Sequence, residues 1–344
     1  MSNVAHGGLD DRDLAMLGRS REEMIDLSAN LHPDGPPTAV IEALRSAIVG
    51  HYPSVDAAPL REALAAMHGV DSDCVIVTPG ASAAIYLATA ALVAPGERCA
   101  VFTPTFGEYE RAIEAVDGEV VRCVAEPTAF RLPAMPSRLT AAVLCNPNNP
   151  TGTYLDRASV EALLGATQYL LIDAAYEPLV EDRWAASDLV RDGAPVAAIY
   201  SLTKLFAIPG VRLGYVLAPP AIAALIRRRQ PPWPVGSADI AAGLAAVAGV
   251  KERRASVPAL HDRRRRLERA FADLDVPTTR SRTNFVLAEV GDVASFRAAL
   301  LACGFVVRDA ASFGLTRWIR VAVPAEQAMD RLVSAIGEAQ QAGR

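Results

Sequence analysis

One lysine stands where it could bond covalently to an aldehyde. Lys204 ends the sequence S-L-T-K at residues 201–204, directly after an apolar segment with the pattern of a strand. A lysine amine forms an imine readily when burial or neighbouring cations lower its pKa. Arg212 and the hydroxyls of Ser201 and Thr203 could bind a phosphate group beside it. Taken alone, this tetrapeptide also fits an ordinary loop lysine, and the other motifs of serine β-lactamases, which share S-x-x-K, do not follow.

A carboxylate and a phenol form a second candidate pair. Asp173 ends the apolar segment at residues 170–173, and Tyr176 follows three residues later. A buried carboxylate is unfavourable unless it is paired with a cation. A protonated pyridine nitrogen is such a cation, and its charge makes the ring an electron sink, while Tyr176 could donate to a phenolic oxygen on that ring. The alternative for Asp173 is an ordinary helix cap.

Two further loops follow segments with strand patterns. Residues 146–152 are N-P-N-N-P-T-G and include Asn149, and residues 79–82 are P-G-A-S at the start of a predicted helix. Backbone N–H groups at a helix N-terminus bind phosphate well. Neither loop is a Walker loop or a G-x-G-x-x-G motif, so a nicotinamide dehydrogenase is disfavoured.

The elements that would position these loops alternate along the chain. Apolar strand patterns, several without polar interruptions, occur at residues 74–78, 99–103, 120–124, 141–145, 170–173, 197–201 and 214–218. Helical patterns separate them, which predicts an α/β fold with a mainly parallel sheet and helices on both faces.

The C-terminal third has a different pattern. After Q-P-P-W-P at residues 230–234, a helical stretch runs over residues 237–274, and shorter strand and helix patterns follow. They predict a small α+β domain. We therefore predict an N-terminal arm at residues 1–35, a large domain at 36–235 and a small C-terminal domain at 236–344.

Composition narrows the class of protein. The chain has 344 residues, 51% of them hydrophobic, and a net charge of −5, which argues against a nucleic-acid binder. We predict that two arginine clusters, at residues 227–229 and 263–266, are solvated helix faces. The cysteines form no C-x-x-C motif and the histidines no i, i+4 pair, so no metal site is expected. Without a secretory signal or a membrane-spanning run, a cytoplasmic protein is expected.

The motifs together resemble one family. G-A-S, P-T-F, N-P-N-N-P-T-G, D-x-x-Y, S-L-T-K and R-L-G-Y occur in this order, each after a strand pattern. The sequence resembles fold-type I enzymes of the class I/II aminotransferase superfamily over nearly its whole length. The resemblance implies an aspartate-aminotransferase-like fold and the cofactor pyridoxal 5′-phosphate (PLP), held as a Schiff base by Lys204.

The resemblance also implies roles for individual residues. The catalytic residues would be Lys204, Asp173 and Tyr176. The residues that bind the cofactor would be these three with Ala81, Ser82, Phe106, Asn149, Ser201, Thr203, Arg212 and Tyr52. Tyr52 would reach the phosphate bound by a neighbouring subunit, which implies a homodimer. The substrate would be bound by Arg320 at its α-carboxylate, Arg308 and His6 at a distal phosphate, and also Asn30 and His32.

Two branches of the superfamily fit best. Local sequences at residues 6–8, 26–30, 207–212 and 230–235 look more like L-threonine-O-3-phosphate decarboxylases. The first hypothesis is therefore a decarboxylase that acts at Cα of an amino acid through an external aldimine and a quinonoid. The alternatives are an aminotransferase that resembles histidinol-phosphate aminotransferases, a relative with replacement or cyclisation chemistry, or a PLP-binding regulator without turnover. The partner in each case is a small-molecule amino acid, with neither nucleic acid nor membrane.

Overall fold

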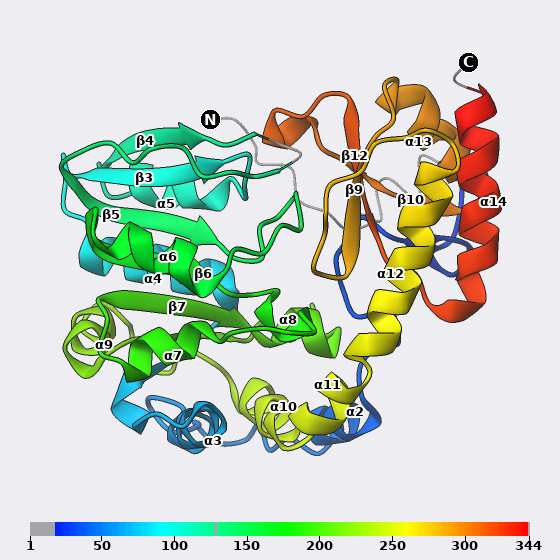
Figure 1. Cartoon of the computed structure of the whole chain (residues 1–344). Coiled ribbons are helices and arrows are strands. Elements are labelled where there is room, and N and C mark those ends of the chain that lie inside the picture. Colours follow the sequence, from blue (N-terminus) through cyan, green and yellow to red (C-terminus); the bar gives the residue numbers. More distant parts are fainter. Residues whose placement is uncertain (1–17, 127–128, 343–344) are drawn as a thin grey trace.

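The computed structural model describes residues 18–126 and 129–342. Figure 1 shows a large sheet with helices on both faces, and beside it a smaller group of strands covered by helices. The predicted α/β class with an aspartate-aminotransferase-like arrangement is confirmed. No helix in the described ranges combines the length and apolar character needed to span a bilayer.

The large sheet has seven strands in the order β2-β8-β7-β6-β5-β3-β4. Their bounds are β2 Val75–Thr78, β3 Arg98–Thr103, β4 Glu119–Val124, β5 Leu139–Cys145, β6 Thr167–Asp173, β7 Val196–Ser201 and β8 Gly214–Leu217. The strands from β7 to β4 pair in parallel, and β8 is antiparallel to both of its neighbours. The mainly parallel sheet predicted from the sequence is therefore present.

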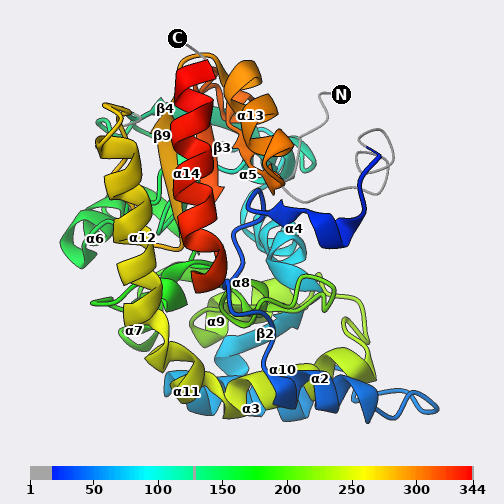
Figure 2. The same cartoon turned by 90° about the vertical axis from the view of Figure 1, so that its right-hand side faces the viewer.

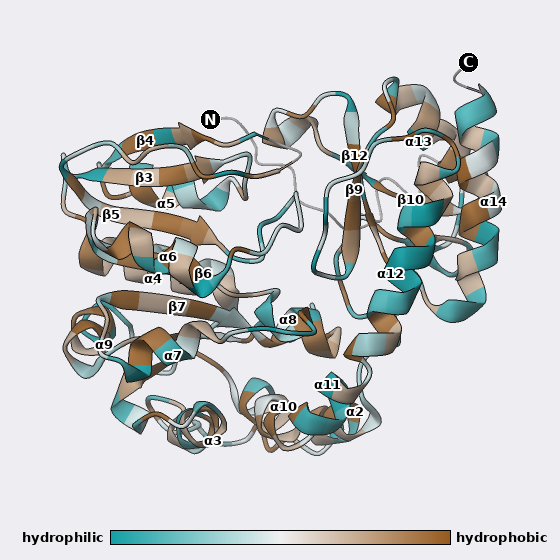
Figure 3. Ribbon diagram, viewed as in Figure 1, coloured by the Kyte–Doolittle hydropathy of each residue, from teal (hydrophilic) through white to brown (hydrophobic). Residues whose placement is uncertain are grey.

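Both faces of this sheet are buried. One face packs against α4 Gly80–Leu92, α5 Glu108–Glu114 and α9 Pro220–Arg227. The other packs against α2 Thr38–Arg45, α3 Ala58–His68, α6 Arg157–Leu164, α7 Ala186–Arg191 and α10 Ser237–Ala248. Along β7, Ala197 and Ile199 face the first layer, whereas Ala198 and Tyr200 face the second. This explains why the strand patterns are apolar throughout, and the hydrophobic colour of β5 and β7 in Figure 3 agrees.

The smaller group contains a three-stranded sheet in the order β11-β12-β9. Its strands are β9 Phe285–Glu289, β11 Arg308–Asp309 and β12 Trp318–Ala322. The helices α12 Val257–Ala272, α13 Val293–Ala302 and α14 Glu326–Ala342 cover it with a third hydrophobic cluster. Figure 2 shows α12, α13 and α14 together on this side.

Short elements connect these layers. They are β1 Ile25–Asp26, β10 Phe305–Val306, α8 Leu202–Phe206, α11 Val250–Ala255 and the 3-10 helices η1 Arg21–Glu23, η2 Ser72–Cys74, η3 Glu177–Leu179 and η4 Ala311–Phe313. The strand β1 pairs in parallel with β10, so part of the N-terminal arm belongs to the smaller group.

The helical stretch predicted at residues 237–274 is three helices. It is interrupted at Gly249 and at Ser256, and Pro258 occupies the first turn of α12, where its missing N–H is tolerated. Although α10 follows the predicted boundary at residue 235, it packs against α2 and α3. The domain limits stay a prediction.

The second arginine cluster is not a uniformly solvated face. Arg263 and Arg264 of α12 are buried, and they pair with Asp34 and Glu268. The pattern missed this because Asp34 lies far away in the sequence. Long arginine side chains can bury their stems while an acidic partner meets the charge.

Candidate active site

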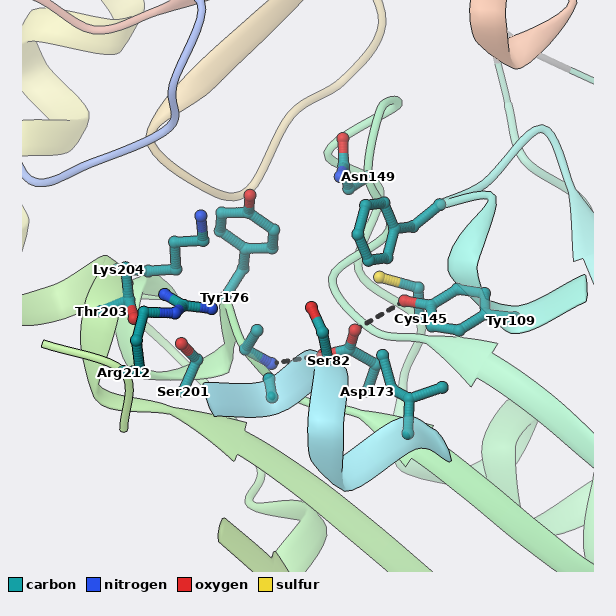
Figure 4. Close-up of a pocket in the computed structure, with 14 residues that line it drawn as sticks. Ser82, Tyr109, Cys145, Asn149, Asp173, Tyr176, Ser201, Thr203, Lys204 and Arg212 are labelled. Atoms are coloured by element: carbon teal, nitrogen blue, oxygen red, sulfur yellow. Dashed lines mark hydrogen bonds between the residues drawn. The ribbon is translucent and has the colours of Figure 1, made fainter. Parts of the chain in front are cut away.

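A cavity of about 120 Å³ lies at the carboxyl ends of β5, β6 and β7. Ten predicted residues line it: Ala81, Ser82, Phe106, Asn149, Asp173, Tyr176, Ser201, Thr203, Lys204 and Arg212. Figure 4 shows Lys204 and Arg212 on one side of this cavity and Asp173 on the other. The parallel order of the strands brings these loops together, because ligands bind beyond the carboxyl ends of such strands.

Lys204 is placed by the short helix α8, which follows β7 directly. Its Nζ lies 5.8 Å from the centroid of the Tyr176 ring. The pKa of Lys204 is lowered to about 8, chiefly by burial and also by the charges of Arg320 and Arg212, while Asp173 opposes this shift. Near neutral pH, this amine is therefore far more nucleophilic than an exposed lysine.

Asp173 ends β6 and is buried. Its Oδ2 accepts a hydrogen bond from Tyr109 Oη at 2.6 Å, and its Oδ1 accepts one from the Ala175 N–H at 2.9 Å. Burial raises the pKa of Asp173, whereas these two donors and the charge of Lys204 lower it. The carboxylate is thus fixed in orientation and suited to meet a further positive charge.

Two glycines allow the start of α4 to approach its neighbours. A Cβ at Gly214 would lie 2.6 Å from the Ala81 nitrogen, and one at Gly80, where φ is +86°, would lie 2.8 Å from Arg212 Nη2. The first N–H groups of α4 are therefore held beside the Arg212 guanidinium. Free N–H groups at a helix N-terminus and an arginine together favour a bound anion.

A second pocket of about 200 Å³ adjoins the first and shares Lys204, Tyr176 and Asn149 with it. Arg308 and Arg320 also line it, and they are direct partners across the antiparallel strands β11 and β12. Two like charges thus face each other beside the lysine.

Arg320 is the more buried of these two cations. It donates to Asn149 Oδ1, and its Nη2 donates to the Ser28 carbonyl at 2.7 Å. Its buried Nε has no hydrogen-bond partner among residues 18–126 and 129–342. Burial lowers the pKa of Arg320 to about 10, and the charge of Arg308 acts in the same direction. Arg320 is therefore positioned to bind an anion in this pocket.

Asn30 reaches the same pocket from the N-terminal arm. Its Nδ2 donates to Tyr176 Oη at 3.2 Å. Burial raises the pKa of Tyr176 to about 12. The phenol therefore stays protonated at neutral pH and can donate a hydrogen bond into the cavity.

Two predicted residues lie elsewhere. Tyr52 is 84% exposed and its ring lies 5.0 Å from that of Trp233, outside both cavities. His32 is buried, but its Nε2 lies 2.9 Å from Ser256 Oγ, and it does not line the pocket that contains Asn30. His6 lies outside the described residues.

Sequence reasoning missed several residues that line these cavities. Tyr109 and Cys145 line the first, and Ser28, Ser312 and Phe313 line the second. Tyr109 is three residues after Phe106, at the second position of α5, and this spacing was the available signal. Cys145 ends β5 and looked like an ordinary core residue.

The arrangement matches the functional groups of PLP. A buried amine could bond to its aldehyde, a buried carboxylate could face its ring nitrogen, and the start of α4 with Arg212 could hold its phosphate. We call the start of α4 together with Arg212 the phosphate cradle. Gly80 and Gly214 allow a geometric test of it, since a methyl group at either position would fill its space.

Comparisons with known proteins point the same way. A profile of the family described as aminotransferase class I and II matches residues 22–336. The sequence is 31% identical over 345 residues to histidinol-phosphate aminotransferase 2 of Ralstonia nicotianae, covering 95% of this chain and 92% of the relative. It is 30% identical over 352 residues to threonine-phosphate decarboxylase of Salmonella typhimurium, covering 97% and 96%.

The fold was compared with solved structures in the same way. The crystal structure of histidinol-phosphate aminotransferase from Sinorhizobium meliloti, in complex with pyridoxal-5′-phosphate, aligns with a TM-score of 0.85 at 22% identity. The alignment covers 98% of this chain and 96% of that one. All these matches extend over nearly the full length of both proteins.

Proposed function

Because this chain belongs to the class I and II aminotransferase family of PLP-dependent enzymes, we propose that it is an aminotransferase whose amine substrate carries a phosphate group. The sequence alone favoured the decarboxylase branch. The aminotransferase is preferred because several relatives at about the same identity are named histidinol-phosphate aminotransferase.

One observation carries this proposal: Arg308 and Arg320 face each other beside Lys204. Like charges directly opposite on paired strands destabilise a sheet. An anionic ligand that binds between the two arginines would therefore offset their repulsion. Guanidinium groups bind phosphates and carboxylates through paired hydrogen bonds. The pair therefore fits a phosphorylated amine in one half of the reaction and a dicarboxylate acceptor in the other.

We propose the following roles at the cofactor. Ala81 and Ser82, through their N–H groups, would bind the phosphate together with Ser201, Thr203 and Arg212. Asp173 would pair with the ring nitrogen, Phe106 would stack on the ring, and Tyr176 and Asn149 would bind its phenolic oxygen. When bound, PLP supplies a ring that withdraws electrons from Cα of the substrate.

Lys204 would also move protons. With its pKa lowered to about 8, Nζ can accept a proton from Cα and return it elsewhere at physiological pH. Asn30 would keep the Tyr176 phenol oriented through its hydrogen bond, and Arg320 would fix one anionic group of the substrate. The residues thus divide into those that hold the substrate and one that transfers the proton.

Decarboxylation of a phosphorylated amino acid is the second candidate. The Salmonella relative named threonine-phosphate decarboxylase matches this chain over 97% of its length. A substrate with both a carboxylate and a phosphate would place one anion on each arginine. The same pocket would then serve both anions in a single molecule.

The exposed side chain of Tyr52 fits a further proposal. We propose that the protein is a homodimer in which Tyr52 reaches the phosphate site of the partner subunit, because nothing within its own cavities uses it. Sedimentation at several protein concentrations would test this. A monomer that binds PLP fully would contradict it.

The cytoplasmic location expected from the sequence stays a prediction.

The test compares two products. The purified protein is incubated with PLP and 2-oxoglutarate, and either histidinol phosphate or O-phosphothreonine is added. Glutamate formed from histidinol phosphate without carbon dioxide supports the aminotransferase. Carbon dioxide from O-phosphothreonine, independent of 2-oxoglutarate, supports the decarboxylase. Neither product from either compound would contradict both.

A variant connects the result to the carrying observation. Arg308→Gln should raise KM for the phosphorylated substrate about tenfold, the effect of losing one charge-assisted hydrogen bond. Arg297→Gln is the matched control, because Arg297 lies near the same strand and contacts Asp309 but does not line the pocket. Equal effects of the two substitutions would refute the role of Arg308.

A further inference from the structure

A third cavity, of about 580 Å³, lies behind the active site. It is bounded by α3, β7, α8, α10 and α11, and in Figure 1 the helices α10 and α11 lie below β7 and α8. Its volume falls in the range of small-molecule sites, and it exceeds both active-site cavities. Nothing in the proposed reaction uses it.

The charges around this cavity do not balance. Arg183, Arg254 and Lys251 line it, and Glu177 is the one carboxylate among its lining residues. His68, also in the lining, is kept neutral, because burial lowers its pKa to about 3. The described lining therefore has an excess of positive charge.

Neither guanidinium is fully satisfied. Arg183 pairs with Glu177, but its buried Nε has no hydrogen-bond partner in the described ranges. The half-buried Arg254 side chain makes no hydrogen bond or ion pair with any described residue. Burial lowers the pKa of Arg254, and the like charge of Arg183 adds to this effect, while Glu177 opposes it. One carboxylate thus faces two neighbouring guanidinium groups, and a second anion would stabilise the half-buried Arg254 further.

Much of the remaining wall is apolar. Met67 of α3, Leu202 of α8 and Val247 of α10 line the cavity, and all three pack with the main hydrophobic core. A ligand that fits must therefore combine an anionic group with an apolar body. A carboxylate suits the planar guanidinium, which can bind both of its oxygens.

We propose that this cavity binds an organic monocarboxylate with an apolar body, held by Arg254 beside Arg183.

The same short helix contacts both sites. Thr203 and Lys204 of α8 line the cofactor cavity, whereas Leu202 and Leu205 line the carboxylate site. Ligand binding therefore also changes the surroundings of Lys204, and a small shift in the absorbance of the bound cofactor accompanies it.

The test uses 3-phenylpropanoate and its neutral amide as probes, titrated into the PLP-bound enzyme by calorimetry. Since Arg320 can also bind carboxylates, the titration is repeated with Arg320→Ala. The expected Kd is the same within about twofold in this variant, at least about tenfold weaker in Arg254→Leu, and at least about tenfold weaker for the amide.

Two variants control the substitution of Arg254. Arg228→Leu removes an exposed arginine that does not line the cavity and should leave the Kd unchanged. Arg254→Lys keeps the charge and should give an intermediate Kd. Arg254→Leu should not lower the melting temperature, because burial and the charge of Arg183 outweigh the attraction of Glu177 for this half-buried cation.

Several results would overturn the proposal. These are no binding of 3-phenylpropanoate at millimolar concentration, equal binding of acid and amide, or binding that disappears in Arg320→Ala but persists in Arg254→Leu. The last result would place the probe in the active site alone.

Discussion

The hydrogen bond from Tyr109 to Asp173 makes a prediction about the acidity of the active site. Tyr109→Phe removes one oxygen from a fully buried side chain and with it the 2.6 Å bond to Asp173 Oδ2. A hydrogen bond to a charged group contributes about 1.5–3 kcal/mol. One pKa unit corresponds to about 1.4 kcal/mol, so the pKa of Asp173 should rise by about one to two units.

The direction follows from which form the donor stabilises. Tyr109 donates to the ionised carboxylate, so its loss favours the protonated acid and adds to the effect of burial, which already raises the pKa of Asp173. The Ala175 N–H remains as a donor. A protonated Asp173 cannot pair with a cationic ring nitrogen, so activity should be lost at a higher pH than in the parent enzyme.

The assay is the pH dependence of kcat/KM. Its acidic limb should move upward by about one to two pH units in Tyr109→Phe. Tyr86→Phe is the matched control, because Tyr86 donates to Glu108 Oε2 at 2.8 Å but lines neither active-site cavity. If the acidic limb of Tyr109→Phe stays within about 0.3 units of the parent, the assignment of Asp173 as the tuned carboxylate is refuted.

Three further predictions concern the cradle, the fold and the substrate. Gly214→Ala should weaken PLP binding about tenfold or more in an absorbance titration, because the new Cβ would lie 2.6 Å from the Ala81 nitrogen. Gly210→Ala is the control and should bind PLP normally, because a Cβ at this position has no atom within 4 Å. Burial lowers the pKa of His68 to about 3, so the unfolded state binds its proton more strongly between pH 6.5 and 3, and stability falls as pH falls through this window. Between pH 6.5 and 4.5, the free energy of unfolding measured in urea should fall by about 2–3 kcal/mol less in His68→Gln than in the parent protein. Arg320→Lys should raise KM for the anionic substrate about tenfold while kcat changes less, and the opposite division would contradict substrate binding by this residue.

The residues that the sequence located well share one property. Asp173 and Ser201 each end a buried parallel strand, and the loops that follow must meet at one edge of the sheet. Local pattern and one topological rule predict that Lys204 and Asp173 lie at the same edge of the sheet, whereas their roles at a cofactor came from the family resemblance. The mainly parallel sheet follows from the same pattern of uninterrupted apolar strands.

What the sequence did not show are contacts between distant parts of the chain. Tyr109 meets Asp173 across 64 positions, and His32 is held by Ser256 across 224. The pairing of Arg308 with Arg320 depends on the register between β11 and β12, and a two-residue strand has no pattern that fixes its register. Such contacts follow from packing, and no local spacing encodes them.

The electrostatics of the two active-site cavities connect cofactor binding to the acidity of Lys204. Burial lowers the pKa of this lysine most, Arg320 and Arg212 lower it as well, and Asp173 is the carboxylate that opposes them. Without bound anions, the amine is therefore readily deprotonated and able to react with an aldehyde. An anionic substrate at Arg320 and a phosphate at Arg212 would neutralise these cations and raise the pKa again. The same lysine would then hold a proton more firmly once both anions are in place, which is the state in which a proton must be kept and transferred.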